Sequence, residues 1–197
     1  TTAIASKVLP SVVTIEVSGG GSGGSGSGVV LSEDGYVVTN THVVTLDGAT
    51  GDATVRVTTS DGKIYDAEVV GTDPTYDLAV IKLKDASGLT PIEFADSSDL
   101  NVGDVTVAIG APLGLENTVT TGIVRALNRS IEIASSAAPE GGSADEDEPE
   151  GEQSPGQQGP FQFDIPGQQA QPGRSAGMII LAVIRTDAAI NPGNSGG

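Results

Sequence analysis

The fold class is decided by the stretch Val29-Val30-Leu31-Ser32-Glu33-Asp34-Gly35-Tyr36-Val37-Val38-Thr39. Two short apolar runs flank a polar turn of four residues, and this arrangement predicts a β-hairpin. Further alternating runs predict strands on both sides of it, at 11–18, 53–59, 64–71 and 78–83. About six strands by residue 85, separated by short turns, are typical of a small β-sandwich or barrel.

The second half of the chain repeats this strand pattern after a connection at 86–104. The strands are predicted at 106–109, 117–127 and 178–186. An insertion at about 134–175, rich in Ala, Gly, Pro, Gln and acidic residues, buries too little apolar surface to offset chain entropy, so we expect a mobile loop. The run Gly19 to Gly28 offers no side chains to pack and is expected to be a second flexible loop. A short helix is expected over residues 1–10.

Composition narrows the classes of function. Aromatic residues make up only 3% of the 197 residues, so the core is expected to consist of Val, Ile, Leu and Ala. The formal net charge of −17 argues against nucleic acid or anionic membrane surfaces as partners. The sequence has no Cys, and its acidic insertion lacks the spacing of an EF-hand, so we expect no metal and no cofactor. The longest apolar run, Met178–Ile184, is too short to span a bilayer.

The chain closes on Gly193-Asn194-Ser195-Gly196-Gly197, a serine held between glycines. A tight turn of this kind presents a hydroxyl and directs neighbouring N–H groups to one spot, which makes Ser195 a candidate nucleophile. The same pattern also describes an ordinary polar turn. A serine hydroxyl is a poor nucleophile at neutral pH, so the chemistry needs a base and an acid that orients the base.

One residue of the chain can serve as a base near neutral pH. His42 is the single histidine and follows the returning strand of the hairpin, where a polar side chain can face a cleft. The orienting acid should stand at a strand edge, and Asp77 directly precedes the apolar strand at 78–83. Asp77 could instead cap a turn, and Asp73 is the rival acid, although Asp73-Pro74 is typical of turn initiation.

Five blocks of sequence carry a family resemblance. They are Gly35–Val44, Asp73–Lys82, Gly103-Asp104 with Ile109–Pro112, Val119–Val124 and Thr186–Gly197. In content and order they resemble the HtrA/DegP family of bacterial envelope proteases, which belongs to the chymotrypsin-like serine proteases. The blocks cover most of the chain outside the two expected loops.

The resemblance implies an all-β, two-barrel chymotrypsin-like fold with the site in the cleft between the barrels. The first barrel would span residues 1–95 and carry His42 and Asp77. The second barrel would span residues 96–197, carry Ser195, and be incomplete in this chain.

The resemblance also implies the catalytic roles. Ser195 would attack the scissile carbonyl, His42 would take its proton and pass it to the leaving amine, and Asp77 would hold the histidine tautomer. The oxyanion hole is expected in the turn Gly193, Asn194 and Ser195, with the N–H groups of Gly193 and Ser195 as donors.

Substrate contacts are expected at Ala189 and Ile190. Ala189 lies six residues before Ser195, where the resemblance implies the floor of the S1 pocket. A small apolar floor offers no partner for Lys or Arg and predicts small aliphatic P1 residues. Asn194 stands where secreted digestive relatives carry an acid that pairs with a newly cut N-terminus, so activation by propeptide cleavage is not expected.

Features outside the five blocks raise further expectations. The family's second barrel continues past the nucleophile, and a PDZ domain usually follows. Both are expected downstream and are absent here. The missing strands would leave sheet edges and one wall of the S1 pocket unmade, so we expect this piece alone to have low or no activity. The insertion at 134–175 either tunes activation or is a plain solvated loop. A homotrimer is left open, because the family often trimerises through N-terminal aromatic residues and residues 1–18 contain none.

The sequence therefore predicts a serine endopeptidase of the HtrA type that cleaves unfolded or damaged polypeptides. It would work outside the cytoplasm, in a bacterial cell envelope or secreted, with a membrane anchor upstream of residue 1 left open. The alternatives are a chaperone-like protein-binding module on the same fold and an inactive protease fragment. The complete set His42, Asp77 and Ser195 argues against a pure binder, which has no need of all three.

Overall fold

A computed structural model describes residues 1–19, 21–47, 53–111, 118–134, 178–191 and 193–197. Residues 1–138 and 176–197 form one compact unit, and every element named below belongs to it. The insertion expected at 134–175 lies, apart from Ala134, outside the described residues. Within those ranges, no helix reaches the length and apolarity that a membrane crossing requires.

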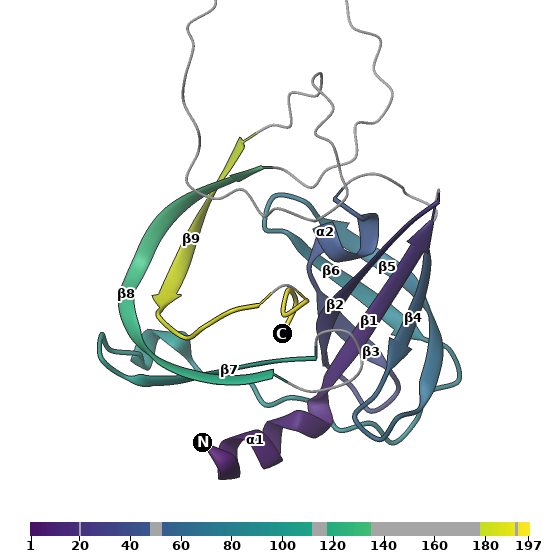
Figure 1. The fold of residues 1–197 in the computed structure, drawn as a ribbon, viewed down its shortest axis with the longest axis horizontal. Helices are drawn as coiled ribbons and strands as arrows, with labels where there is room; N and C mark the ends of the chain where they lie inside the picture. Colours follow the sequence, from purple (N-terminus) through teal and green to yellow (C-terminus); the bar gives the residue numbers. More distant parts are fainter. Residues whose placement is uncertain (20, 48–52, 112–117, 135–177, 192) are drawn as a thin grey trace, which may run out of the picture. The chain divides into compact units, whose positions relative to one another are not determined.

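Six strands in the first half of the chain close into a barrel (Figure 1). They are β1 (Val12–Gly19), β2 (Ser22–Val30), β3 (Tyr36–Thr39), β4 (Thr54–Thr58), β5 (Ile64–Asp73) and β6 (Leu78–Leu83). Around the barrel the order is β1-β2-β3-β6-β5-β4, and each neighbouring pair is antiparallel. The predicted hairpin is β2–β3, in which Val29 pairs with Val38 and Val30 with Val37.

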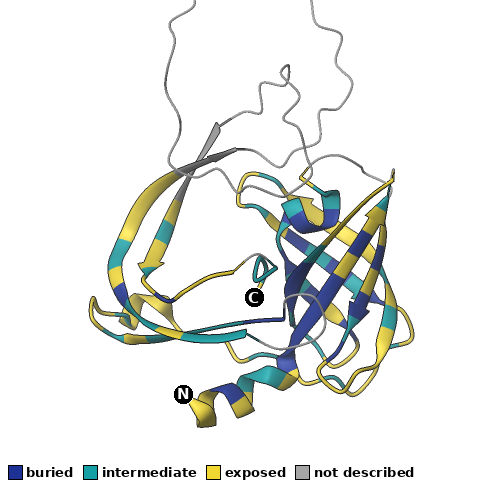
Figure 2. Cartoon of the chain, viewed as in Figure 1, coloured by how far each residue is buried: buried dark blue, intermediate teal, exposed yellow. Residues whose placement is uncertain are grey.

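The barrel core is aliphatic, as the composition predicts. Figure 2 shows its buried positions on the barrel strands. Its fully buried members alternate along the strands, and the cluster consists of Val13, Ile15, Val17, Val30, Val37, Val43, Val44, Val55, Val57, Ala79, Ile81 and Leu83. Val43 and Val44 belong to α2 (Thr41–Thr45), a single helical turn directly after β3. The expected N-terminal helix is α1 (Thr2–Val8), which passes into a 3₁₀ turn (Leu9–Ser11) that contains Pro10.

The expectation of a flexible loop at Gly19 to Gly28 is wrong, because Ser22 to Gly28 belong to β2. β2 pairs with β1 from Gly19↔Ser22 to Val12↔Val29. The glycines make room for the neighbours of the strand: a Cβ on Gly28 would lie 2.7 Å from Val37 Cγ1 and 2.8 Å from Ile15 Cδ1. The strand therefore forms because its neighbours pack closely against the glycines, and the sequence of the run itself does not reveal those neighbours.

The second half forms a three-stranded sheet, with the order β7 (Val105–Gly110), β8 (Thr118–Ala134) and β9 (Met178–Thr186). All three strands are predicted, but β8 runs on to Ala134 instead of ending at residue 127. Its polar stretch around Asn128 suggests a turn, whereas the strand continues through two register shifts, with Asn128 at φ 52°. The expected domain division at residue 95 falls between β6 and β7 and stays a prediction. The barrel and the partial second sheet together match the chymotrypsin-like fold.

A substitution in β2 tests whether its glycines are required by packing. Gly28→Ala should lower the free energy of unfolding by about 1–3 kcal/mol, because the added methyl group overpacks a filled core. Gly23→Ala is the matched control, since its Cβ would lie 3.5 Å from the nearest atom, the Val17 carbonyl oxygen. Urea unfolding of both variants measures the difference, and equal stabilities would contradict the packing explanation.

Candidate active site

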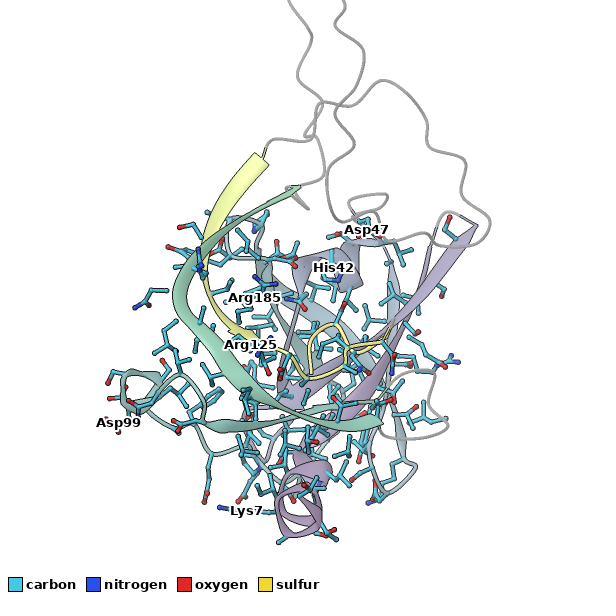
Figure 3. The ribbon with its side chains drawn as sticks, turned by 60° about the vertical axis from the view of Figure 1, so that its left-hand side comes forward. Lys7, His42, Asp47, Asp99, Arg125 and Arg185 are labelled. Atoms are coloured by element: carbon cyan, nitrogen blue, oxygen red, sulfur yellow. The ribbon has the colours of Figure 1, made fainter. Side chains whose placement is uncertain are left out.

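His42 is placed by α2 at the mouth of the barrel (Figure 3). Val43 and Val44, the next two residues, are buried in the core and anchor the helical turn. The His42 side chain is 31% exposed, so its ring is partly screened from water and still within reach of a reactant.

Asp77 lies directly before β6 and contacts His42 through both carboxylate oxygens. Oδ1 accepts the main-chain N–H of His42 at 2.9 Å, and Oδ2 lies 2.6 Å from ring Nδ1. An ionised carboxylate can only accept, so Nδ1 carries the proton and the neutral ring leaves Nε2 free of hydrogen. This is the tautomer that a general base at Nε2 requires.

The backbone at Asp77 is held in an unusual conformation. Its φ of 54° lies in the left-handed region, which Asp tolerates better than most residues. Its carbonyl oxygen accepts from Asn40 Nδ2 at 2.7 Å and from Thr41 N–H at 3.2 Å. The Thr41 hydroxyl adds a 2.6 Å bond to the carbonyl of Leu78. The residues just before His42 thus fix the acid that orients it.

Asp73, the rival acid, has a different role. Its Oδ1 accepts the main-chain N–H groups of Thr75 and Tyr76, at 3.0 and 3.3 Å. This is the local turn bonding that Asp-Pro sequences favour. The structure therefore brings Asp77, and not Asp73, to His42.

The electrostatics at His42 favour its protonated form. Burial lowers the pKa of the ring, but the hydrogen bond and the negative charge of Asp77 outweigh burial, with a further contribution from Asp47 (Figure 3). The net result is a pKa of His42 raised above its usual 6.5. A base whose conjugate acid is stabilised in this way accepts a proton more readily.

The turn that carries Ser195 lies directly on β2 (Figure 1). The Ser195 carbonyl accepts the N–H of Ser27 at 2.7 Å, and the Gly193 carbonyl accepts the Ser27 hydroxyl at 2.9 Å. A Cβ on Gly196 would lie 2.1 Å from the Ser27 carbonyl oxygen and 2.4 Å from Thr39 Oγ1. Gly196 also has φ +90°, so both space and backbone conformation require glycine there.

The same contacts bring the Ser195 turn to the His42 end of the barrel. A Cβ on Gly26 would lie 2.8 Å from the Val43 side chain and 3.1 Å from the Ser195 carbonyl oxygen. Val43 directly follows His42 in sequence. Thr39, which borders Gly196, comes shortly before His42 at the end of β3. Gly26 of β2 thus lies close both to the residue that follows His42 and to the Ser195 turn, while Asp77 is joined to His42 itself.

Within the expected oxyanion turn, the N–H group of Asn194 already has a hydrogen-bond acceptor. The N–H of Asn194 already donates to the Asn191 carbonyl at 3.1 Å, which leaves Gly193 and Ser195 as the donors to consider. Gly193 has φ 91°, a conformation that favours glycine. Asn194 Oδ1 is buried and has no hydrogen-bond partner among the described residues. A neutral amide tolerates such burial far better than a carboxylate would.

The segment before this turn is fixed along β8. The Asp187 carboxylate accepts the Ile123 N–H at 2.8 Å, and the Ala189 carbonyl accepts the Thr120 hydroxyl at 2.7 Å. Ala189 and Ile190 are both exposed, with Ile190 at 60%. Their side chains are therefore accessible for contact with another molecule.

Several residues of the site were missed from sequence. Ser27 and Thr39 support the Ser195 turn, and Asn40 and Thr41 support Asp77. The signal for Ser27 was its place two residues before the apolar run Val29-Val30-Leu31, but the surrounding Gly/Ser composition concealed it. Among the described residues, no group of three or more His, Asp and Glu side chains could hold a metal ion.

Comparison with known proteins defines the class. Residues 26–197 match the family model of the trypsin-like peptidase domain. The chain is 41% identical over 198 residues to serine protease PepD of Mycobacterium tuberculosis, covering 98% of this chain and 35% of that protein. It is 52% identical over 120 residues to the periplasmic serine endoprotease DegP of Escherichia coli, covering 56% of this chain and 24% of that protein.

Solved structures of similar fold point to the same class of serine protease. The crystal structure of Deg5 matches all of this chain and 76% of its own, at 31% identity and a TM-score of 0.65. The HtrA-type protease AlgW with a tripeptide matches 65% of this chain and 40% of its own, at 36% identity and a TM-score of 0.58. The chain belongs to the trypsin-like peptidase domain family, and within it to the HtrA type of serine protease. It spans about a third of PepD and about a quarter of DegP.

The raised pKa of His42 can be tested directly, because His42 is the single histidine of the chain. An NMR titration of its ring should give a pKa above 6.5. Asp77→Asn should lower that pKa, since burial then acts without the neighbouring charge. Asp73→Asn is the matched control and should leave the pKa of His42 unchanged. A pKa at or below 6.5 in the native chain would contradict the described pairing.

Proposed function

We propose that the full-length protein is a serine endopeptidase that uses Ser195, His42 and Asp77 in an acyl-enzyme mechanism. The observation that carries this proposal is the two-oxygen contact of Asp77 with His42, which fixes the Nδ1–H tautomer. A general base at Nε2 requires this tautomer, and a pure binder has no need of His42, Asp77 and Ser195 together. The family membership of the chain supports the same conclusion.

The proposed reaction has two stages. In the first, Ser195 Oγ attacks the scissile carbonyl carbon while His42 Nε2 takes the hydroxyl proton. The negative charge on the carbonyl oxygen is stabilised by N–H groups of Gly193 and Ser195. His42 then gives its proton to the amine, which leaves as the C–N bond breaks. In the second stage, water repeats these steps and releases the acyl group.

The proposed substrates are unfolded polypeptides with small aliphatic residues at P1. Ala189 and Ile190, which are exposed on the segment before the nucleophile turn, would contact the P1 side chain. Neither offers a charge for Lys or Arg. The periplasmic placement in the name of DegP supports a site of action outside the cytoplasm. A homotrimer is the oligomeric state that the family resemblance implies, but residues 1–18 lack the aromatic residues through which the family often trimerises.

A fluorophosphonate probe tests the proposed nucleophile, because an activated serine displaces its fluoride and becomes covalently labelled. The full-length protein should be labelled and should cut a denatured protein after Val, Ala or Ile. Ser195→Ala should lose both properties, with at least about a 10³-fold lower rate of cleavage. The exposed Ser22→Ala is the matched control and should keep both.

Two results would contradict the proposal. Labelling that persists in Ser195→Ala would remove Ser195 from its role, and a protein that binds unfolded chains without labelling would favour the chaperone-like alternative. Cleavage mainly after Lys or Arg would contradict the proposed P1 preference alone.

A further inference from the structure

We infer that Ser27 is a positioning residue, whose hydroxyl holds the Ser195 turn (the nucleophile turn). This inference rests on the proposed function of Ser195. Ser27 lies in β2 on the barrel and has an exposed fraction of 0%. The partners of its hydroxyl are the Gly193 carbonyl and the Ala111 N–H. Its effect on the reaction would come from the peptide groups around Ser195.

Three hydrogen bonds fix three successive peptide groups at the nucleophile. The Gly193 carbonyl accepts from Ser27 Oγ at 2.9 Å, and the Ser195 carbonyl accepts from the Ser27 N–H at 2.7 Å. Between them, the Asn194 carbonyl accepts from the Gly197 N–H at 3.0 Å. Ser27 thus holds the peptide groups on both sides of the Asn194–Ser195 pair, and the turn itself holds the one in the middle.

Peptide planarity converts these contacts into control of the nucleophile. Each fixed carbonyl also fixes the N–H of the residue that follows it, because both lie in one rigid plane. When the planes on both sides of a residue are fixed, its φ and ψ are fixed as well. The planes on both sides of Ser195 are held by the N–H groups of Gly197 and Ser27, and they set the direction of its Cα–Cβ bond. The Ser27 hydroxyl holds the preceding plane, Gly193–Asn194, so it fixes φ and ψ of Asn194 and the direction in which the chain enters Ser195.

The Ser27 hydroxyl has no freedom to rotate to other partners. Its oxygen accepts the N–H of Ala111 at 2.8 Å, so its single proton is available for the Gly193 carbonyl. Ala111 is only 5% exposed. If the hydroxyl is removed, the Gly193 carbonyl loses its anchor and the Ala111 N–H loses its acceptor in a place where water cannot easily replace it.

The chain supplies a matched control on the neighbouring strand. Thr14 of β1 is the register partner of Ser27, and its hydroxyl donates to the carbonyl of the same Ala111 at 2.9 Å. Thr14→Val removes a buried hydroxyl from Ala111 while the contacts of the nucleophile turn stay intact. Ser27→Ala and Thr14→Val therefore differ mainly in whether Gly193 loses its hydrogen bond.

The first test is steady-state kinetics on the full-length protein at a temperature where both variants are folded. Ser27→Ala should lower kcat about 10- to 100-fold with KM changed less than about threefold, because a misplaced nucleophile slows the chemical step. Thr14→Val should keep kcat within about threefold of the unsubstituted protein. Equal effects of the two substitutions on kcat would overturn the inference.

The second test does not depend on catalysis. Amide hydrogen exchange of a peptide that covers 191–197 should accelerate at least about tenfold in Ser27→Ala and stay unchanged in Thr14→Val, because local opening governs exchange. Unchanged exchange in Ser27→Ala would overturn the inference even if the unsubstituted protein cleaves nothing. A protein with no activity but with this exchange pattern would instead refute the proposed function and leave Ser27 as the support of the turn.

Discussion

The site depends on one constraint, which is that β2 must let main chain approach main chain. Gly26, Ser27 and Gly28 carry almost no side-chain volume, and three other parts of the protein use the space. Val37 and Ile15 pack against Gly28 in the core, Val43 packs against Gly26 beside His42, and the Ser195 carbonyl reaches the Ser27 N–H. A strand with ordinary side chains would exclude at least two of these neighbours.

This constraint explains how residues far apart in the sequence meet. His42 and Asp77 are joined through the barrel, since Asn40 and Thr41 hold the backbone of Asp77 while its carboxylate holds His42. The Ser195 turn is attached to the same barrel through Ser27 and lies against Thr39. The proposed base, acid and nucleophile are therefore all held by the same barrel, which suits chemistry that tolerates little misplacement.

Much of the fold could be predicted from sequence: the strand at 53–59 alternates in step with its burial, and the apolar run at 78–83 forms a strand whose every second residue is buried. The pairing of Asp77 with His42 was expected from the family resemblance, and the structure decides it against Asp73 through the hydrogen bonds of each. The order of β2 could not be predicted, since glycine and serine have low strand propensity and the reason for the strand lies in its neighbours. The continuation of β8 past residue 127 was missed because Asn128 is typical of a turn.

The most direct measurement is kcat/KM of a folded Gly26→Ala variant of the full-length protein. The added methyl group would lie 2.8 Å from Val43 and 3.1 Å from the Ser195 carbonyl oxygen, so it should push the His42 helix and the nucleophile turn apart. We expect kcat/KM to fall about tenfold or more, whereas Gly23→Ala on the same strand should have little effect. Full activity in Gly26→Ala would contradict the view that close approach on β2 assembles the site.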